Sequence, residues 1–188
     1  LSANINCCGI RYLPDHPASG KRQISEIAGH YLIQVRAIQP KGPYCLAGWC
    51  LGGTIAFEMT RQLEEAGEKV SLLAMINTIC PRRWDGYEDE ERAVLCSLLA
   101  GKKCSPPDVI MDTDTLWNYV MEKVLSGQIS AGQLRADLPR DAAEIIPNYA
   151  TADETTLVKY LNIIRTLHYA RADYYPPGIL AARVCVLE

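Results

Sequence analysis

The chain has 188 residues, of which 48% are hydrophobic and 22% are charged, and its formal net charge is −3. A chain of this size can bury one good core, so we expect one domain, with room for an insertion. The acidic balance and the lack of a basic run argue against nucleic acid as a partner. The sequence contains no apolar stretch long enough to span a bilayer and no signal-peptide pattern at its start, which indicates a cytoplasmic protein.

Eight cysteines are scattered through the predicted strands and helices of a chain too large to need disulfides for stability. We therefore expect free thiols. The sequence holds no C-x-x-C pair and no His-rich pair, so we predict no metal site. We also expect no bound cofactor.

In chain order, residues 4–10 have the pattern of a strand, and a polar loop follows. An apolar stripe at helical spacing then predicts an amphipathic helix from Ile24 to Ile38, which Pro40 and Gly42 end. His30 lies on the polar side of this helix. We interpret it as a solvated histidine rather than a catalytic base.

The next stretch predicts a strand, a sharp turn and a helix. Residues 44–47 are short and apolar, and the helical pattern after the turn continues until Gly67. The turn between them reads G-x-C-x-G over residues 48–52. This is the pattern of the nucleophile elbow of α/β-hydrolases, with Cys50 in the place of the nucleophilic serine and the backbone N–H of Leu51 as one oxyanion donor. The alternative is a buried cysteine in a glycine-rich turn.

The run from Ile27 to Leu63 closely resembles the type I thioesterase domains that end nonribosomal peptide and polyketide assembly lines. The usual sequence at the elbow of that family is G-W-S-x-G-G. Gly48, Trp49, Gly52 and Gly53 fit this pattern as supports of the elbow, with Gly48 and Gly52 leaving space for its strained backbone. Cys50 is the departure from it.

A continuous apolar run from Val70 to Ile76 predicts a parallel strand that is covered on both faces, and hence an α/β fold. Asn77 follows this strand, where the resembling thioesterases usually carry the triad aspartate. A Cys-His-Asn set can perform acyl transfer, so Asn77 is one candidate for the third catalytic residue. The rival is a carboxylate near or just past Glu188, in which case Asn77 only forms a turn.

The rest of the chain is predicted to be mainly helical. Helices are expected over 88–100, from a cap at Asp112 to Gly127, and from about Glu154 to Tyr175, before a strand over 179–187. The resemblance implies a helical lid insertion over 82–176, between an α/β-hydrolase core at 1–81 and a returning core strand at 177–188. The alternative for 82–176 is a satellite domain without a catalytic part.

The resemblance also implies that the α/β-hydrolase fold is incomplete at both ends of this sequence. Neither His16 nor His168 matches the family's catalytic histidine, so we expect the base beyond Glu188 and the second oxyanion donor before Leu1. Among the thiols, we expect Cys50 to be the most reactive, because Cys45, Cys80 and Cys185 fall in or beside predicted buried strands.

The function that these residues and the resemblance favour is release of an acyl or peptidyl chain from a carrier-protein phosphopantetheine thioester, through an acyl-enzyme on Cys50. The partners are then an upstream carrier protein and its acyl chain. A cysteine thioester stays activated, so we hypothesise release by cyclisation to a strained lactone or lactam or a macrocycle, with hydrolysis as the second choice. The alternatives are a degenerate docking module, a Ser-to-Cys variant that traps an intermediate, and a small-molecule hydrolase with a cysteine nucleophile.

Overall fold

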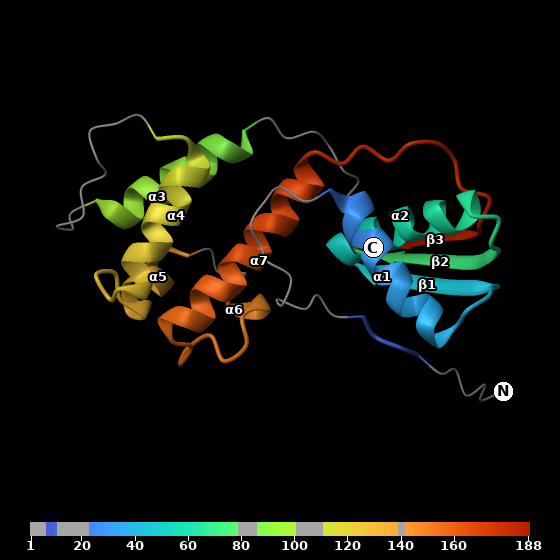
Figure 1. Cartoon of the computed structure of the whole chain (residues 1–188), viewed down its shortest axis with the longest axis horizontal. Helices are drawn as coiled ribbons and strands as arrows, with labels where there is room; N and C mark the ends of the chain where they lie inside the picture. The colour runs from blue at the N-terminus through green and yellow to red at the C-terminus, as the bar shows by residue number, and fades with distance from the viewer. Residues whose placement is uncertain (1–6, 11–22, 79–85, 101–110, 139–141) are drawn as a thin grey trace. The chain divides into compact units, whose positions relative to one another are not determined.

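The computed structural model describes residues 7–10, 23–78, 86–100, 111–138 and 142–188. These residues fall into two compact units. One unit comprises the described residues of Leu1–Arg82 and Tyr174–Glu188, and the other comprises those of Arg83–Asp173. We call them the core unit and the helical unit. Figure 1 shows that all three strands belong to the core unit.

The core unit contains a parallel sheet with the strand order β1-β2-β3. The strands are β1 (Tyr44–Trp49), β2 (Val70–Ile76) and β3 (Val184–Leu187). The predicted strand at Val70 to Ile76 is confirmed, and the one at 44–47 extends to Trp49. The strand predicted over 179–187 begins only at Val184. Residues 7–10 of the strand predicted over 4–10 are not in a strand, and 4–6 lie outside the described residues.

One helix packs on a face of this sheet, and a second helix packs on the first. Helix α2 (Leu51–Glu65) contacts β1 and β2, and α1 (Ile24–Ile38) contacts α2. Their apolar stripes are buried, which confirms both predicted helices; the buried side chains include Ile24, Ile27, Leu32, Ile55, Met59 and Leu63. Gly67 follows α2 with a φ of 76°, a conformation that glycine adopts without strain.

The opposite face of the sheet is open among the described residues. Side chains alternate along a strand, so Cys45, Ala47 and Trp49 share this face, and all three are exposed. On β2, their neighbours Leu72 and Ala74 are half-buried and Ile76 is exposed, so our prediction that β2 is covered on both faces is wrong for the described part of the chain. The prediction that Cys45 is buried is wrong for the same reason, whereas Cys80 lies outside the described residues.

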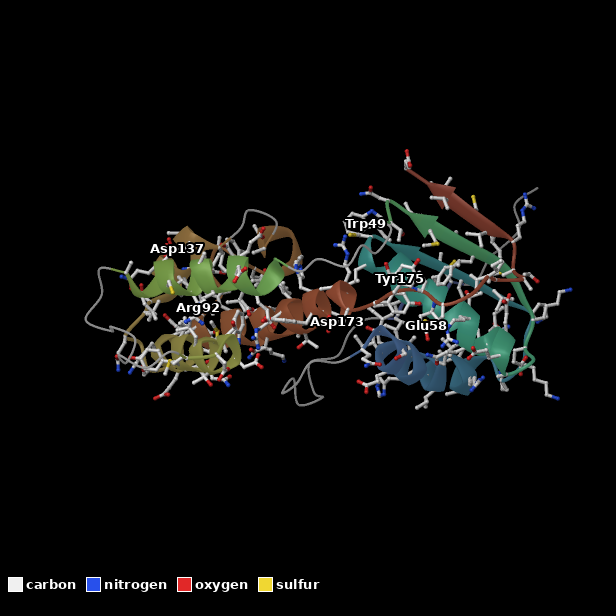
Figure 2. The ribbon with its side chains drawn as sticks, turned by 90° about the horizontal axis from the view of Figure 1, so that it is seen from above. Trp49, Glu58, Arg92, Asp137, Asp173 and Tyr175 are labelled. Atoms are coloured by element: carbon white, nitrogen blue, oxygen red, sulfur yellow. The ribbon has the colours of Figure 1, made fainter. Side chains whose placement is uncertain are left out.

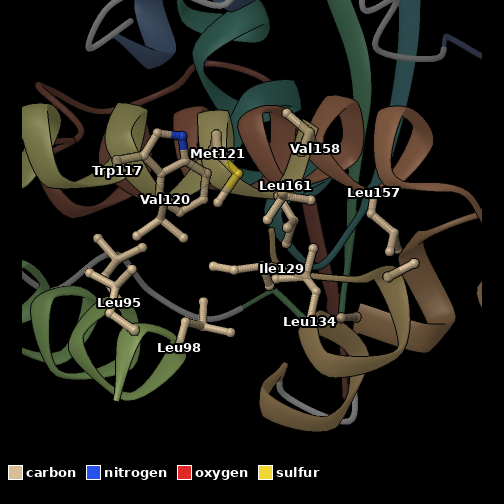
Figure 3. Packing of buried hydrophobic residues seen from close by; sticks show 14 of the residues in the cluster. Leu95, Leu98, Trp117, Val120, Met121, Ile129, Leu134, Leu157, Val158 and Leu161 are labelled. Atoms are coloured by element: carbon tan, nitrogen blue, oxygen red, sulfur yellow. The ribbon is translucent and has the colours of Figure 1, made fainter. Parts of the chain in front are cut away.

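The helical unit has an apolar core of its own (Figure 3). It contains α3 (Tyr87–Leu99), α4 (Thr113–Leu125), α5 (Ala131–Asp137), α6 (Ala142–Ile145) and α7 (Glu154–Ala172). Asp112 caps α4 as predicted, accepting a hydrogen bond from the N–H of Thr115 at 2.8 Å. The last helix ends at Ala172, earlier than the prediction of Tyr175. Helices α5 and α6 were not anticipated, because they are short.

Polar contacts also hold the helical unit together. The Arg165 guanidinium donates to both carboxylate oxygens of Glu91, at 2.7 and 3.1 Å, and packs over the ring of Trp117. The Trp117 indole N–H donates to Asn162 at 2.7 Å. Tyr169 donates its hydroxyl to Glu91, and burial together with this hydrogen bond raises the pKa of Tyr169. Each of these buried polar groups therefore has a partner.

Candidate active site

The turn between β1 and α2 has the geometry of an elbow. Cys50 is the N-cap residue of α2 and has a φ of 52° and a ψ of −122°. A positive φ is strained for a cysteine, so the surrounding contacts must hold it. Its N–H donates to the carbonyl oxygen of Ile76 at 2.9 Å, and its own carbonyl accepts from the N–H of Gly53 at 3.0 Å. Cys50 is half-buried at this turn.

Two glycines allow the backbone to approach closely here. A Cβ atom on Gly48 would overlap the backbone of Gly52 and Gly53, and one on Gly53 would overlap the side chain of Thr78. At Gly52, in contrast, a Cβ atom would meet nothing within 4 Å. The close approach that we expected at Gly48 and Gly52 is therefore found at Gly48 and Gly53. Trp49, between Gly48 and Cys50, is 64% exposed.

Helix α2 points its N-terminus at the elbow. Leu51 is its first residue, and the first N–H groups of a helix have no partner within that helix. The helix dipole also favours negative charge at this end. The backbone here can therefore supply an N–H to an oxygen that gains negative charge beside Cys50.

The carboxyl ends of the three strands meet beside this turn. The N–H of Cys50 is hydrogen-bonded to Ile76 at the end of β2. The N–H of Asn77 donates to the carbonyl oxygen of Leu187 at 2.7 Å, at the end of β3. These two bonds bring Cys50, Asn77 and the residue after Leu187 to one edge of the sheet. Asn77 is exposed and has a φ of 46°. Asparagine tolerates this left-handed conformation better than most residues do, which suits a turn former as well as a catalytic group.

Thr78 is a residue of this edge that the sequence did not identify. Its side chain fills the space where Gly53 has no Cβ atom, so the residues after β2 pack against the first turn of α2 at this point. The pair of glycines at 52 and 53 was a signal that one of them allows a close contact. The identity of the contacting residue needed the sheet register, because Thr78 is distant in sequence.

Neither of the two described histidines belongs to this turn. His30 lies on α1 and His168 on α7, each with interactions of its own, and His16 lies outside the described residues. Six cysteines are described, and all are free thiols, with Cys45 exposed and Cys185 half-buried. No cluster of three metal-binding side chains occurs within the described ranges. None of the helices described there could cross a membrane.

Comparison with known proteins gives a family and a fold. A family model described as "Thioesterase domain" matches residues 1–170. The NocB thioesterase domain, solved as a covalent complex with a fluorophosphonate nocardicin G analog, superposes with a TM-score of 0.50. The match covers 92% of this chain and 55% of that one at 20% identity. The likeness shows the α/β-hydrolase fold, as predicted.

Curated relatives are assembly-line synthases. The dimodular nonribosomal peptide synthase of Bacillus subtilis (strain 168) is 33% identical over 174 residues, which are 88% of this chain and 6% of that protein. The non-reducing polyketide synthase PKS16 of Cladonia grayi is 49% identical over 67 residues, or 36% of this chain and 3% of that protein. This chain therefore spans only a small part of each relative's length.

Proposed function

This chain belongs to the thioesterase domain family, whose members act on thioesters, and on that premise we propose that it releases a chain from a carrier protein through Cys50. The chain to be released is acyl or peptidyl, and it arrives as a thioester of phosphopantetheine. The observation that carries the proposal is the elbow itself. Cys50 occupies a strained turn between a parallel strand and the N-terminus of α2, which is where an α/β-hydrolase holds its nucleophile.

The first step transfers the acyl group to sulfur. The thiolate of Cys50 attacks the thioester carbonyl carbon, and the negative charge moves to the carbonyl oxygen. The N–H of Leu51 stabilises that oxygen at the end of the helix. The intermediate then collapses, the bond from carbon to the pantetheine sulfur breaks, and that sulfur leaves as a thiol with the proton that Cys50 gave up. The product is an acyl thioester on Cys50 and a free carrier thiol.

The second step returns Cys50 to its free form. A hydroxyl or amine of the bound chain, or a water molecule, attacks the new thioester and loses its proton, while Cys50 leaves and regains one. We infer ring closure, because a cysteine thioester keeps the carbonyl more reactive toward amines than a serine ester does. Hydrolysis is the other outcome that this site allows.

We propose two alternatives for the residue that orients the catalytic base. In one, Asn77 holds a histidine, as in a Cys-His-Asn set. In the other, a carboxylate after β3 does so, near or just past Glu188. The bond between the N–H of Asn77 and Leu187 supports both forms equally, since it brings the two positions to one edge.

We also propose that the helical unit acts as a lid and that the partner of this chain is an upstream carrier protein. Both proposals come from the family, in which a helical insertion covers the acyl chamber. The curated relatives are multidomain synthases, which supports the carrier protein in general terms. The separate apolar core of the helical unit supports a body that can move as a whole.

The test is mass spectrometry of the protein after incubation with an acylated carrier protein. We expect one acyl mass on Cys50, and its loss in Cys50→Ala. Cys45→Ala is the matched control, because Cys45 is also a free thiol and is exposed. Acylation that persists in Cys50→Ala contradicts the nucleophile. The lack of any acyl mass under turnover conditions with the unsubstituted protein favours a docking module.

A further inference from the structure

A buried carboxylate lies in the middle of α2, the helix that begins at the elbow. Glu58 is only 1% exposed. It accepts hydrogen bonds from Arg61 at 2.6 and 2.8 Å, from Gln62 at 2.9 Å and from the hydroxyl of Tyr174 at 2.7 Å. Burying an ionised carboxylate is costly unless it is paired and fully hydrogen-bonded. These four bonds meet that requirement.

The hydrogen bonds keep Glu58 ionised. Burial alone would raise the pKa of this carboxyl, but the bonds from Arg61, Gln62 and Tyr174 together hold its pKa below the ordinary value. Burial of the phenol, together with the same contact, raises the pKa of Tyr174. The contact is therefore a charge-assisted hydrogen bond between a carboxylate and a neutral phenol, which is a strong type.

Tyr174 is the point at which the chain rejoins the core unit. The helical unit ends at Asp173, and the core unit resumes at Tyr174. We call residues 174–183, which lead from there to β3, the return segment. Figure 2 labels Glu58 on α2, Asp173 at the end of α7 and Tyr175 just after it, within the return segment.

A second carboxylate of α2 binds the other end of the return segment. Glu64 accepts from the N–H groups of Ala181 and Ala182, at 2.8 and 2.7 Å. The carbonyl of Arg183 then accepts from the N–H of Leu73 at 2.9 Å, at the start of the pairing between β2 and β3. The return segment is thus bonded to α2 near both of its ends. The helix that positions Cys50 also fixes where the chain returns from the helical unit.

We propose that Glu58 and Tyr174 are positioning residues for acyl release, because their contact fixes the hinge of the helical unit on the nucleophile-bearing helix. The inference rests on the proposed function. With Tyr174 held by Glu58, movement of the helical unit at this connection is confined to the residues before Tyr174 and is not passed along the return segment to β3. Without the contact, the hydrogen bonds that still tie the return segment to α2 among the described residues are those from Ala181 and Ala182 to Glu64.

The test compares Tyr174→Phe with Tyr175→Phe. The first substitution removes only the hydroxyl that Glu58 accepts, and the second removes the hydroxyl of a neighbour that is 82% exposed. We expect amide hydrogen exchange at Ala181 and Ala182, whose N–H groups donate to Glu64 at the far end of the return segment, to become about tenfold faster or more in Tyr174→Phe, because a hydrogen bond to a charged group that anchors this segment is lost. We expect no change in Tyr175→Phe. Glu58→Gln is the second variant and should act in the same direction.

The functional readout separates a positioning role from a structural one. In Tyr174→Phe, we expect the rate at which a small soluble thioester acylates Cys50 to stay within about twofold of that of the unsubstituted protein. We expect the rate of product release, or the ratio of cyclic to linear product, to change by about fivefold or more. Equal exchange in the two tyrosine variants overturns the anchor. Faster exchange with unchanged release and product ratio overturns the positioning role. No acylation in the unsubstituted protein contradicts the proposed function instead, and hydrogen exchange still decides the anchor.

Discussion

Replacing Gly48 by alanine tests the elbow most directly. A Cβ atom there would overlap three backbone atoms, the carbonyl carbon and oxygen of Gly52 and the nitrogen of Gly53. Backbone atoms cannot rotate away as a side chain can, so the strand and the first turn of α2 must move apart. Forced overpacking of this kind costs about 1–3 kcal/mol.

Gly52→Ala is the matched control, two residues into α2. A Cβ atom at this position meets nothing within 4 Å, and Gly52 has no positive φ. Alanine is favoured over glycine inside a helix by about 0.5–1 kcal/mol, so this variant should be as stable as the unsubstituted protein or slightly more stable. The two substitutions add the same methyl group and should have opposite effects.

The assay is thermal unfolding followed by circular dichroism, together with the acylation rate of Cys50. For a protein of this size, about 1 kcal/mol shifts Tm by roughly 2–4 °C, so Gly48→Ala should lower Tm by about 2–12 °C. Its acylation rate should fall by about tenfold or more, because small displacements of a nucleophile are costly. A Gly52→Ala protein that loses as much stability as Gly48→Ala would refute the steric reasoning.

Three further outcomes are expected. Cys45 should react with iodoacetamide in the native protein, because it lies on the open face of the sheet; full protection in a peptide map would show that this face is covered. Trp117→Phe should destabilise the helical unit by about 1–2 kcal/mol in urea unfolding, since it removes the hydrogen bond to Asn162 and leaves that amide oxygen unpaired; an unchanged free energy of unfolding would contradict this. Because the folded-state pKa of Glu58 is lowered, its stabilising effect is present above its unfolded pKa of about 4.5 and is lost as the pH falls below it. Glu58→Gln should therefore make the free energy of unfolding depend less on pH at acidic pH, and an unchanged pH dependence would contradict this.

The local structure of the core unit could be predicted because its signals are local. Helical spacing of apolar residues and the glycine after it defined α2, and the short apolar runs defined β1 and β2. The G-x-C-x-G spacing indicated a sharp turn with a strained backbone, and the structure has a positive φ at Cys50. These features depend on residues close together in the sequence.

Features that depend on distant residues could not be predicted. Glu58 resembles any polar residue on a helix, and one of the four hydrogen bonds that satisfy it when buried comes from Tyr174, which is distant in sequence. The exposure of Cys45 follows from the lack of a described element on one sheet face, which a strand's own pattern does not reveal. The helix predicted to end at Tyr175 ends at Ala172, because Tyr174 is bonded to Glu58 of the core unit rather than continuing α7.

We propose a common chemical reason for the residues at positions 50 and 77, and it can be tested. A thiol loses its proton more easily than a hydroxyl, so a cysteine nucleophile depends less on the charge of the residue that orients its base. If Asn77 orients the base, Asn77→Asp should change the acylation rate by less than about threefold with Cys50 in place, but should raise it by about tenfold or more in a Cys50→Ser background. The two substitutions then show coupling in a double-mutant cycle of acyl transfer from a carrier protein, measured in single turnover. If Asn77→Asp has the same effect with cysteine and with serine, the two positions are independent. Asn77 is then a turn former at φ 46°, and a carboxylate after β3 takes the orienting role.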